Sequence, residues 1–204
     1  MALTKPERQI RAAYDDTIVR VYQAYSHQIA NAALASGTFV TPTFKMDRMT
    51  WIKPSFLWMM YRSGWAKKDA DQLRILAIDI SRSGFEWALE NSCLSHRPAE
   101  MDQETWQHLK AQSPVRVQWD PERNLQLEPQ QHRAIQIGLS GIALEKYVSS
   151  WIRSISDITD FSLEISLLVS GGQMDLASSK LPNEEPYPLS DEMKERLGVN
   201  KVSS

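Results

Sequence analysis

The stretch RMTWIKPSFLWMMYRSGW, residues 48–65, contains the most informative helix of this chain. Pro54 suits a first helical turn and Gly64 suits a C-cap, with only apolar and aromatic residues from Phe56 to Tyr61. A helix that is apolar on all sides is buried on most of them. The apolar run is far shorter than the roughly 20 residues that cross a bilayer. We therefore predict a core helix over 54–63.

The segments around this helix alternate between strand and helix patterns. Period-2 and continuous apolar runs predict strands at 17–25, 73–81, 115–119 and 132–139. Helical periodicity predicts helices at 26–37, 84–92, 102–112, 140–155 and 157–172. Because these elements do not alternate as regular βαβ units, we expect an α+β domain whose mixed or antiparallel sheet core is flanked by helices.

Length and composition are those of one globular domain. The 204 residues are 42% hydrophobic and 24% charged, which is enough to bury a core. We expect a single domain over 1–204, with a core of about 10–175 and a proline-rich C-terminal tail, 178–204, packed on the surface. The net charge of −2 produces no overall attraction to nucleic acid or anionic lipid.

The sequence also limits the compartment and the chemistry. The one cysteine, Cys93, cannot form an internal disulfide, and the N-terminus lacks the apolar core of a signal peptide, so we expect a cytoplasmic protein. The histidines lack a metal-binding spacing, and no metalloprotease, serine hydrolase, P-loop or dinucleotide-binding motif occurs. We predict neither a metal site nor a membrane partner, and the oligomeric state stays open.

Cations and an indole gather around the central helix. Lys53 and Ser55 lie beside the free backbone N–H groups of its first turn, where the helix dipole attracts anions. Arg48 and Trp51 precede them with strand-like alternation, and Arg62 follows on the helix. A cation, an aromatic face and a helix N-terminus together suit a nucleotide. The alternative is that Ser55 only begins the helix and Trp51 packs in the core.

Two predicted strands carry polar side chains. Gln23 and Tyr25 share a face with valines, so they either find hydrogen-bond partners inside the protein or line a cavity. Gln136 shares a face with Ala134 and Gly138, and small residues fit a site that a ligand approaches closely. Each strand is therefore a candidate wall of a binding site.

The segment WDPER, residues 119–123, is predicted to be a turn. Asp120, Glu122 and Arg123 offer a general base or a charge clamp there. The same composition is also typical of an ordinary solvated turn, so both interpretations stay open.

Six blocks support a family resemblance. They are IRAAYDDTIVRVYQAY, GTFVTPTFKMDRMTWIKPSFLWMMYRSGWA, GFEWAL, PVRVQWDPER, RAIQIGLSG and LPNEEPYPL. Together they resemble the uncharacterised family called domain of unknown function 4291, from about residue 10 to 197. This resemblance implies no particular activity.

A second resemblance concerns the fold. VYQAY (21–25) with the helix after it resembles the opening of ADP-ribosyltransferases, and MTWIKPSFLWMMY is similar to their second strand–helix unit. RAIQIGL is similar to the later strand that carries Glu or Gln. The resemblance implies an NAD cofactor, with Gln23 and Tyr25 at the nicotinamide ribose and Gln136 acting on a ribose hydroxyl. Gln23 replaces the usual His or Arg, and Ala24 replaces the usual Gly.

We therefore expect a nucleotide-binding protein with an ADP-ribosyltransferase-like fold that transfers ADP-ribose from NAD to an unidentified acceptor. A glutamine amide does not take up a proton at neutral pH, so a carboxylate such as Glu122, or a group of the acceptor itself, is expected to remove the proton. The alternative is a noncatalytic module that binds RNA or single-stranded nucleic acid. An enzyme predicts one deep pocket lined by Gln23, Lys53 and Gln136, and a module predicts an open groove with salt-dependent affinity.

Overall fold

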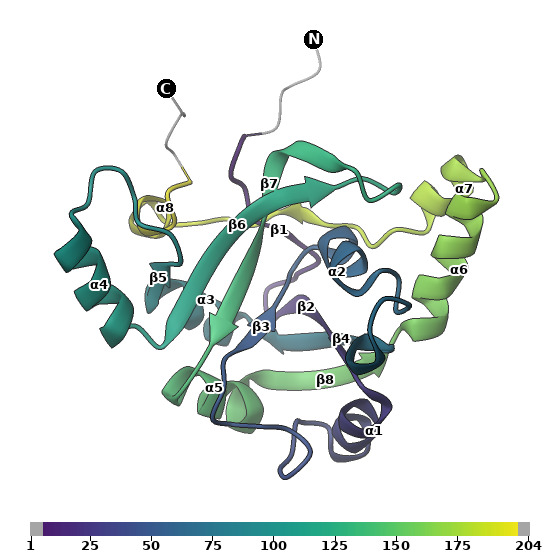
Figure 1. Cartoon of the computed structure of the whole chain (residues 1–204), viewed down its shortest axis with the longest axis horizontal. Helices are drawn as coiled ribbons and strands as arrows, with labels where there is room; N and C mark the ends of the chain where they lie inside the picture. Colours follow the sequence, from purple (N-terminus) through teal and green to yellow (C-terminus); the bar gives the residue numbers. More distant parts are fainter. Residues whose placement is uncertain (1–5, 200–204) are drawn as a thin grey trace.

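Two sheets form the framework of the computed structural model, which describes residues 6–199 (Figure 1). The first sheet is antiparallel in the order β2-β4-β8, with bounds Ile18–Tyr25, Arg74–Ser81 and Ile152–Asp157. The second is mixed in the order β3-β7-β6-β5, with bounds Thr50–Ile52, Pro129–Leu139, Val115–Arg123 and Ser92–Leu94. A short ribbon pairs β1 (Arg11–Ala12) with β9 (Glu185–Pro186). The predicted α+β class is confirmed, and its four predicted strands divide between the two sheets.

Helices cover these sheets, as the sequence predicted. They are α1 (His27–Ser36), α2 (Phe56–Ser63), α3 (Arg82–Glu90), α4 (Gln103–Gln112), α5 (Ile142–Lys146), α6 (Thr159–Ser170), α7 (Met174–Ser179) and α8 (Asp191–Leu197). Helix α1 contacts all three strands of the first sheet, and α2 contacts both β2 and β6. Within residues 6–199, no helix has the length and apolar character needed to cross a membrane.

The hydrophobic core has two parts, one on each face of the three-stranded sheet. Between the sheets, apolar side chains such as Ile78 of β4 and Ile137 of β7 are completely buried. On the other face, Tyr22 and Ile75 pack with side chains of α2 and α6. Strand alternation produces this division, because neighbouring residues of one strand point to opposite faces. The first sheet is therefore covered on both sides.

Helix α2 is the buried helix that the sequence predicted, although it begins two residues later. Phe56, Met59 and Met60 are almost fully buried. Ser55 is extended and its hydroxyl accepts a hydrogen bond from the Trp58 N–H, which makes Ser55 the N-cap. Gly64 is left-handed and ends the helix as a C-cap.

Backbone hydrogen bonds join the edges of the two sheets at one pair of residues, Tyr22 and Lys53, which we call the sheet junction. Tyr22 N–H donates to the Lys53 carbonyl at 2.7 Å, and Lys53 N–H donates to the Tyr22 carbonyl at 3.2 Å. Tyr22 belongs to β2, an edge strand of the first sheet, and Lys53 follows β3, an edge strand of the second. The two strands pair nowhere else among the described residues. They therefore separate beyond the junction.

The turn predicted at 119–123 is wrong, because this segment belongs to β6. The ladder with β7 continues through Asp120 and Pro121, with a register shift before Arg123. Proline cannot donate to a sheet ladder and is tolerated at such an irregularity. The chain turns instead just afterwards, where Asn124 N–H donates to the Glu128 carbonyl.

The helix predicted over 140–155 is only partly correct. Helix α5 passes into a π-helical turn, Tyr147–Trp151, and then into strand β8. Strand β8 pairs with β4, where Ile155 lies opposite Ile78. The apolar spacing fits a helix locally, but pairing along the open edge of β4 satisfies a row of backbone groups that a helix would leave exposed.

A loop and the C-terminal tail complete the fold. Within residues 38–44 the chain turns, and the Phe44 N–H donates to the Val40 carbonyl. The tail was expected to pack on the surface, and within it Tyr187 and Leu197 are buried in the larger core. Residues 200–204 of that predicted tail lie outside the described residues.

Packing around the π-helical turn gives a stability test. A Cβ on Gly84 of α3 would lie 2.5 Å from Cγ of Trp151, whose indole is buried. We expect Gly84→Ala to destabilise the protein by about 1–3 kcal/mol, because overpacking outweighs the roughly 1 kcal/mol helix-propensity gain. Urea unfolding measures the change. Ser83→Ala, an exposed control on the same helix, should stay within about 0.5 kcal/mol; a stabilised Gly84→Ala variant would contradict this packing.

Candidate functional site

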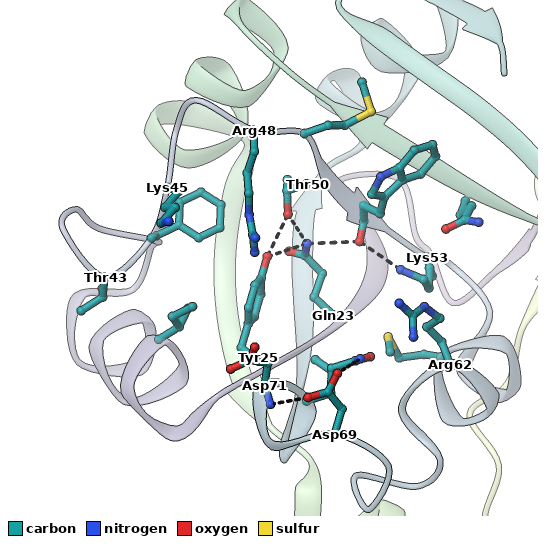
Figure 2. Close-up of a pocket in the computed structure, with 18 residues that line it drawn as sticks. Gln23, Tyr25, Thr43, Lys45, Arg48, Thr50, Lys53, Arg62, Asp69 and Asp71 are labelled. Atoms are coloured by element: carbon teal, nitrogen blue, oxygen red, sulfur yellow. Dashed lines mark hydrogen bonds between the residues drawn. The ribbon is translucent and has the colours of Figure 1, made fainter.

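A cavity of about 570 Å³ opens where β2 and β3 separate beyond the sheet junction (Figure 2). Its walls come from β2, β3, β7, helix α2, the loop before β3 and the 3₁₀ turn Ala70–Gln72. Seven side chains singled out from the sequence line it: Gln23, Tyr25, Arg48, Trp51, Lys53, Arg62 and Gln136. The sheet junction thus brings together residues that are more than a hundred positions apart in the chain.

A buried hydrogen-bond network forms the floor of the cavity. The two N–H groups of Gln23 Nε2 are shared among three acceptors, Tyr25 Oη at 2.9 Å, Thr50 Oγ1 at 2.8 Å and the Trp51 carbonyl at 3.2 Å. Gln23 Oε1 accepts from the Tyr147 hydroxyl at 2.7 Å. Because a carbonyl only accepts, the Trp51 contact fixes which end of the amide faces β3. Gln23 therefore orders the floor with its own amide already engaged.

The hydroxyl groups in this network remain neutral at physiological pH. Burial raises the pKa of Tyr25 to about 12, although its hydrogen bonds with Thr50 and Gln23 act in the opposite direction. Burial also raises the pKa of Tyr147 well above its usual value. Both phenols stay protonated, so the floor offers hydrogen bonds and no charge.

Lys53 supplies a buried cation at the side of the cavity. Only 6% of the residue is exposed, and within residues 6–199 its Nζ makes one hydrogen bond, to the Trp51 carbonyl at 3.3 Å. Its pKa is lowered to about 8, mainly by burial and also by the positive charge of Arg62, while Asp120 acts in the opposite direction. An ammonium has three protons to donate, so two are left for a molecule in the cavity.

Two exposed guanidinium groups also reach the cavity, that of Arg62 near Lys53 and that of Arg48 near Tyr25. Figure 2 shows Arg48 reaching into the cavity from the loop before β3, and Arg62 lying close to Lys53. Among residues 6–199, neither arginine has a carboxylate within ion-pair distance. Asp69 and Asp71 also line the cavity, and the pKa of Asp69 is lowered by hydrogen bonding from the Asp71 N–H and also by the charge of Arg62. The lining as a whole carries more cations than carboxylates and therefore suits an anion.

Gln136 contributes a polar group from β7. Its amide Nε2 donates to Asp120 Oδ2 at 2.8 Å, and Gln118 donates to Asp120 Oδ1 at 2.9 Å. Gln118 and Gln136 lie directly opposite each other on β6 and β7. Asp120 is the nearest carboxylate partner that the structure provides for Gln136, and the sequence had instead favoured Glu122.

Ser55 and Glu122 do not line the cavity. The Ser55 hydroxyl donates to Glu122 Oε1 at 2.9 Å, and the same oxygen accepts from the Arg123 N–H. Phe56 N–H donates to Glu184 Oε1 at 2.7 Å. The start of α2 is thus filled by the hydroxyl and carboxylate of the chain itself, so the expected anion site at this helix N-terminus is not formed.

Two other expectations from the sequence change. Arg123, a proposed charge clamp, lies 3.5 Å above the ring centroid of Tyr61 in a cation–π contact and does not line the cavity. Gly138 was expected to make room for a ligand, but a Cβ there would lie 2.4 Å from Met49 Sδ and 3.0 Å from Trp51 Cε2. The chain fills this space with its own side chains.

Sequence reasoning missed two residues of the site. Thr50 had no distinguishing pattern, and Tyr147 stood within a helix prediction that concealed its direction. Asp120 was singled out, but in a predicted turn, whereas alternation along β6 places it on the same face as Gln118. No group of three or more His, Cys, Asp or Glu residues that could hold a metal occurs between residues 6 and 199.

Comparison with known families identifies the chain. The family model described as domain of unknown function (DUF4291) matches residues 9–187, so the chain belongs to that family. A search of curated proteins finds no match. The site must therefore be interpreted from its own chemistry.

The buried charge of Lys53 gives a test by stability. Lys53 has a folded pKa of about 8, below its unfolded value of 10.5. The charged ammonium therefore destabilises the folded state relative to the unfolded state below pH 8. We expect Lys53→Met to stabilise the protein at pH 7 by about 1–3 kcal/mol. The advantage should shrink as the pH rises from 8 to 10.5.

Chemical denaturation at pH 7 and pH 10 measures this difference. Lys45→Met removes an exposed amine from the same cavity and should change stability by less than about 0.5 kcal/mol at either pH. A Lys53→Met variant less stable than wild type at pH 7 would show that the ammonium is not an uncompensated charge.

Proposed function

We propose that this chain is a nucleotide-binding enzyme that transfers ADP-ribose from NAD to an acceptor. The observation that carries the proposal is that Lys53, Gln136 and the Gln23 network all line one cavity. The order of elements supports it, since β2–α1, β3–α2 and the later β7 follow the ADP-ribosyltransferase resemblance. We take the fold to be ADP-ribosyltransferase-like on this basis.

The cations that line the cavity match a pyrophosphate. Lys53 lies at its base with protons left to donate, and Arg48 and Arg62 stand at the exposed rim. Guanidinium groups bind phosphate oxygens through paired N–H groups, and the ammonium acts as a point charge. A dinucleotide would add negative charge to that which Asp120 places near Lys53 and Asp69 places near Arg62.

The opposite parts of the cavity suit a nucleoside. Trp51 is half-buried and offers an indole face for stacking with a base. Tyr25 and Thr50 share a hydroxyl–hydroxyl hydrogen bond of 2.8 Å on the floor, at the edge of which Gln136 presents its amide. We place the nicotinamide ribose between this floor and Gln136.

The reaction breaks the bond between ribose C1′ and the nicotinamide nitrogen. The bonding electrons pass to the pyridinium nitrogen, so nicotinamide leaves as a neutral molecule, and an acceptor nucleophile forms the new bond to C1′. The proton of the acceptor passes to a carboxylate of the lining, Asp69 or Asp71, because Glu122 lies outside the cavity. The protein orients the ribose and stabilises the oxocarbenium-like centre.

The proposal is tested by binding and turnover together. We expect NAD to bind by calorimetry, and Lys53→Ala to weaken binding by about 1–3 kcal/mol through loss of a charged hydrogen bond. Gln136→Ala should abolish nicotinamide release, measured by chromatography with protein, RNA, DNA and small nucleophiles as acceptors. Lys180→Ala removes a surface cation that pairs with Glu164 and serves as the control.

The alternative, a noncatalytic nucleic-acid-binding module, is an outcome of the same experiment. It is supported if wild-type protein releases no nicotinamide with any acceptor and binds single-stranded oligonucleotides more tightly than NAD. Affinity that falls steeply with salt would then report the phosphate contacts.

A further inference from the structure

The two glutamines of the cavity are oriented by groups that only accept hydrogen bonds. A carbonyl fixes Gln23, and the Asp120 carboxylate fixes Gln136. An amide that touches an ionised carboxylate must turn its NH₂ group toward it, because a carbonyl oxygen would meet another acceptor. The orientation of Gln136 is therefore a consequence of the charge on Asp120.

The two glutamines differ in which side-chain atoms are left to hydrogen-bond a ligand. Gln23 uses its Nε2 for three protein acceptors and its Oε1 for the Tyr147 hydroxyl. The Oε1 atom of Gln136 has no hydrogen bond to any residue in the described range 6–199. Gln136 lines the cavity and is half-buried, so this oxygen is the acceptor left for a bound molecule.

We propose that Asp120 is a positioning residue that holds the Gln136 amide with its oxygen available to the cavity, so that the site selects a ligand hydroxyl able to donate a hydrogen bond. This inference rests on the proposed function, in which that hydroxyl belongs to the ribose of NAD. Asp120 orients the ligand hydroxyl through Gln136, and its charge also raises the pKa of Lys53. The selected group is the ribose 2′-hydroxyl, which neighbours the carbon where the bond breaks.

The strand pairing explains how one carboxylate, that of Asp120, orients the side chains of two glutamines. Gln118 and Gln136 face each other across β6 and β7, and Asp120 accepts from both, one through each oxygen. Replacing Asp120 by Asn leaves one acceptor and one NH₂ group for two glutamine NH₂ groups. One of the two glutamines must then turn or lose its partner, so Gln136 no longer has a single orientation.

The affinities of two ligands test whether the site selects a hydroxyl that donates a hydrogen bond. The first is NAD, and the second carries fluorine in place of the nicotinamide-ribose 2′-hydroxyl, which keeps the size but removes the donor. We expect wild type to bind NAD about tenfold more tightly than the fluorinated ligand, the scale of one hydrogen bond. In Asp120→Asn this ratio should fall to about threefold or less.

A second variant separates positioning from structural damage. In Asp120→Asn combined with Gln118→Leu, the Asn carbonyl is free to face Gln136, because its competitor is gone. The ratio between the two ligands should then recover toward the wild-type value. A general loss of stability would instead weaken the binding of both ligands equally and leave the ratio of their affinities unchanged. Asp160→Asn removes an exposed carboxylate on α6 and is the matched control for charge.

The orientation is also measurable without ligand. In ¹⁵N NMR spectra, the Gln136 side-chain amide should give one pair of proton resonances in wild type and in Asp160→Asn. These resonances should shift or double in Asp120→Asn. Identical Gln136 resonances in wild type and Asp120→Asn would overturn the inference.

The experiment distinguishes failure of the role of Asp120 from failure of the proposed function. If wild type binds NAD but does not distinguish the fluorinated ligand, or if Asp120→Asn distinguishes it equally well, the role of Asp120 is wrong and the proposed function stands. If neither ligand binds, the proposed function is wrong, and selection of a ribose hydroxyl falls with it.

Discussion

Two backbone hydrogen bonds between Tyr22 and Lys53 determine the arrangement of this molecule. They join the edges of two sheets at one residue pair, and the strands separate on the far side of it. The separation opens the cavity, and the same pairing buries the Lys53 side chain at its edge. Helix α2 begins three residues later and packs against both sheets, which holds the junction in place. Fold and site therefore depend on the same two bonds.

Much of this arrangement could be predicted from patterns that are local in sequence. The buried helix and the four main strands follow from apolar spacing, Ser55, Gly64 and β-branched runs, because these signals act within a few residues. Strand β8 could not be found this way. Its residues fit the helix before it, and only the edge of β4, some seventy positions away in the chain, makes a strand the better partner.

Local sequence patterns also predicted only part of the candidate site. Alternation placed Gln23, Tyr25 and Gln136 on strand faces, and the structure brings them to one cavity. The partners of these side chains were not visible in the sequence. Tyr147 reaches Gln23 from a π-helical turn, and Glu184 fills the start of α2 from the C-terminal tail. Such contacts join distant segments, so they follow from the complete fold.

The central claim is that the cavity binds the phosphates of a nucleotide through Lys53. An anion beside this ammonium must raise its pKa from about 8, so binding takes up protons. Calorimetry of NAD binding at pH 8, in two buffers with different ionisation enthalpies, measures this uptake directly. The account predicts uptake of up to about half a proton at pH 8 and almost none at pH 6. Binding without proton uptake at pH 8 would contradict it.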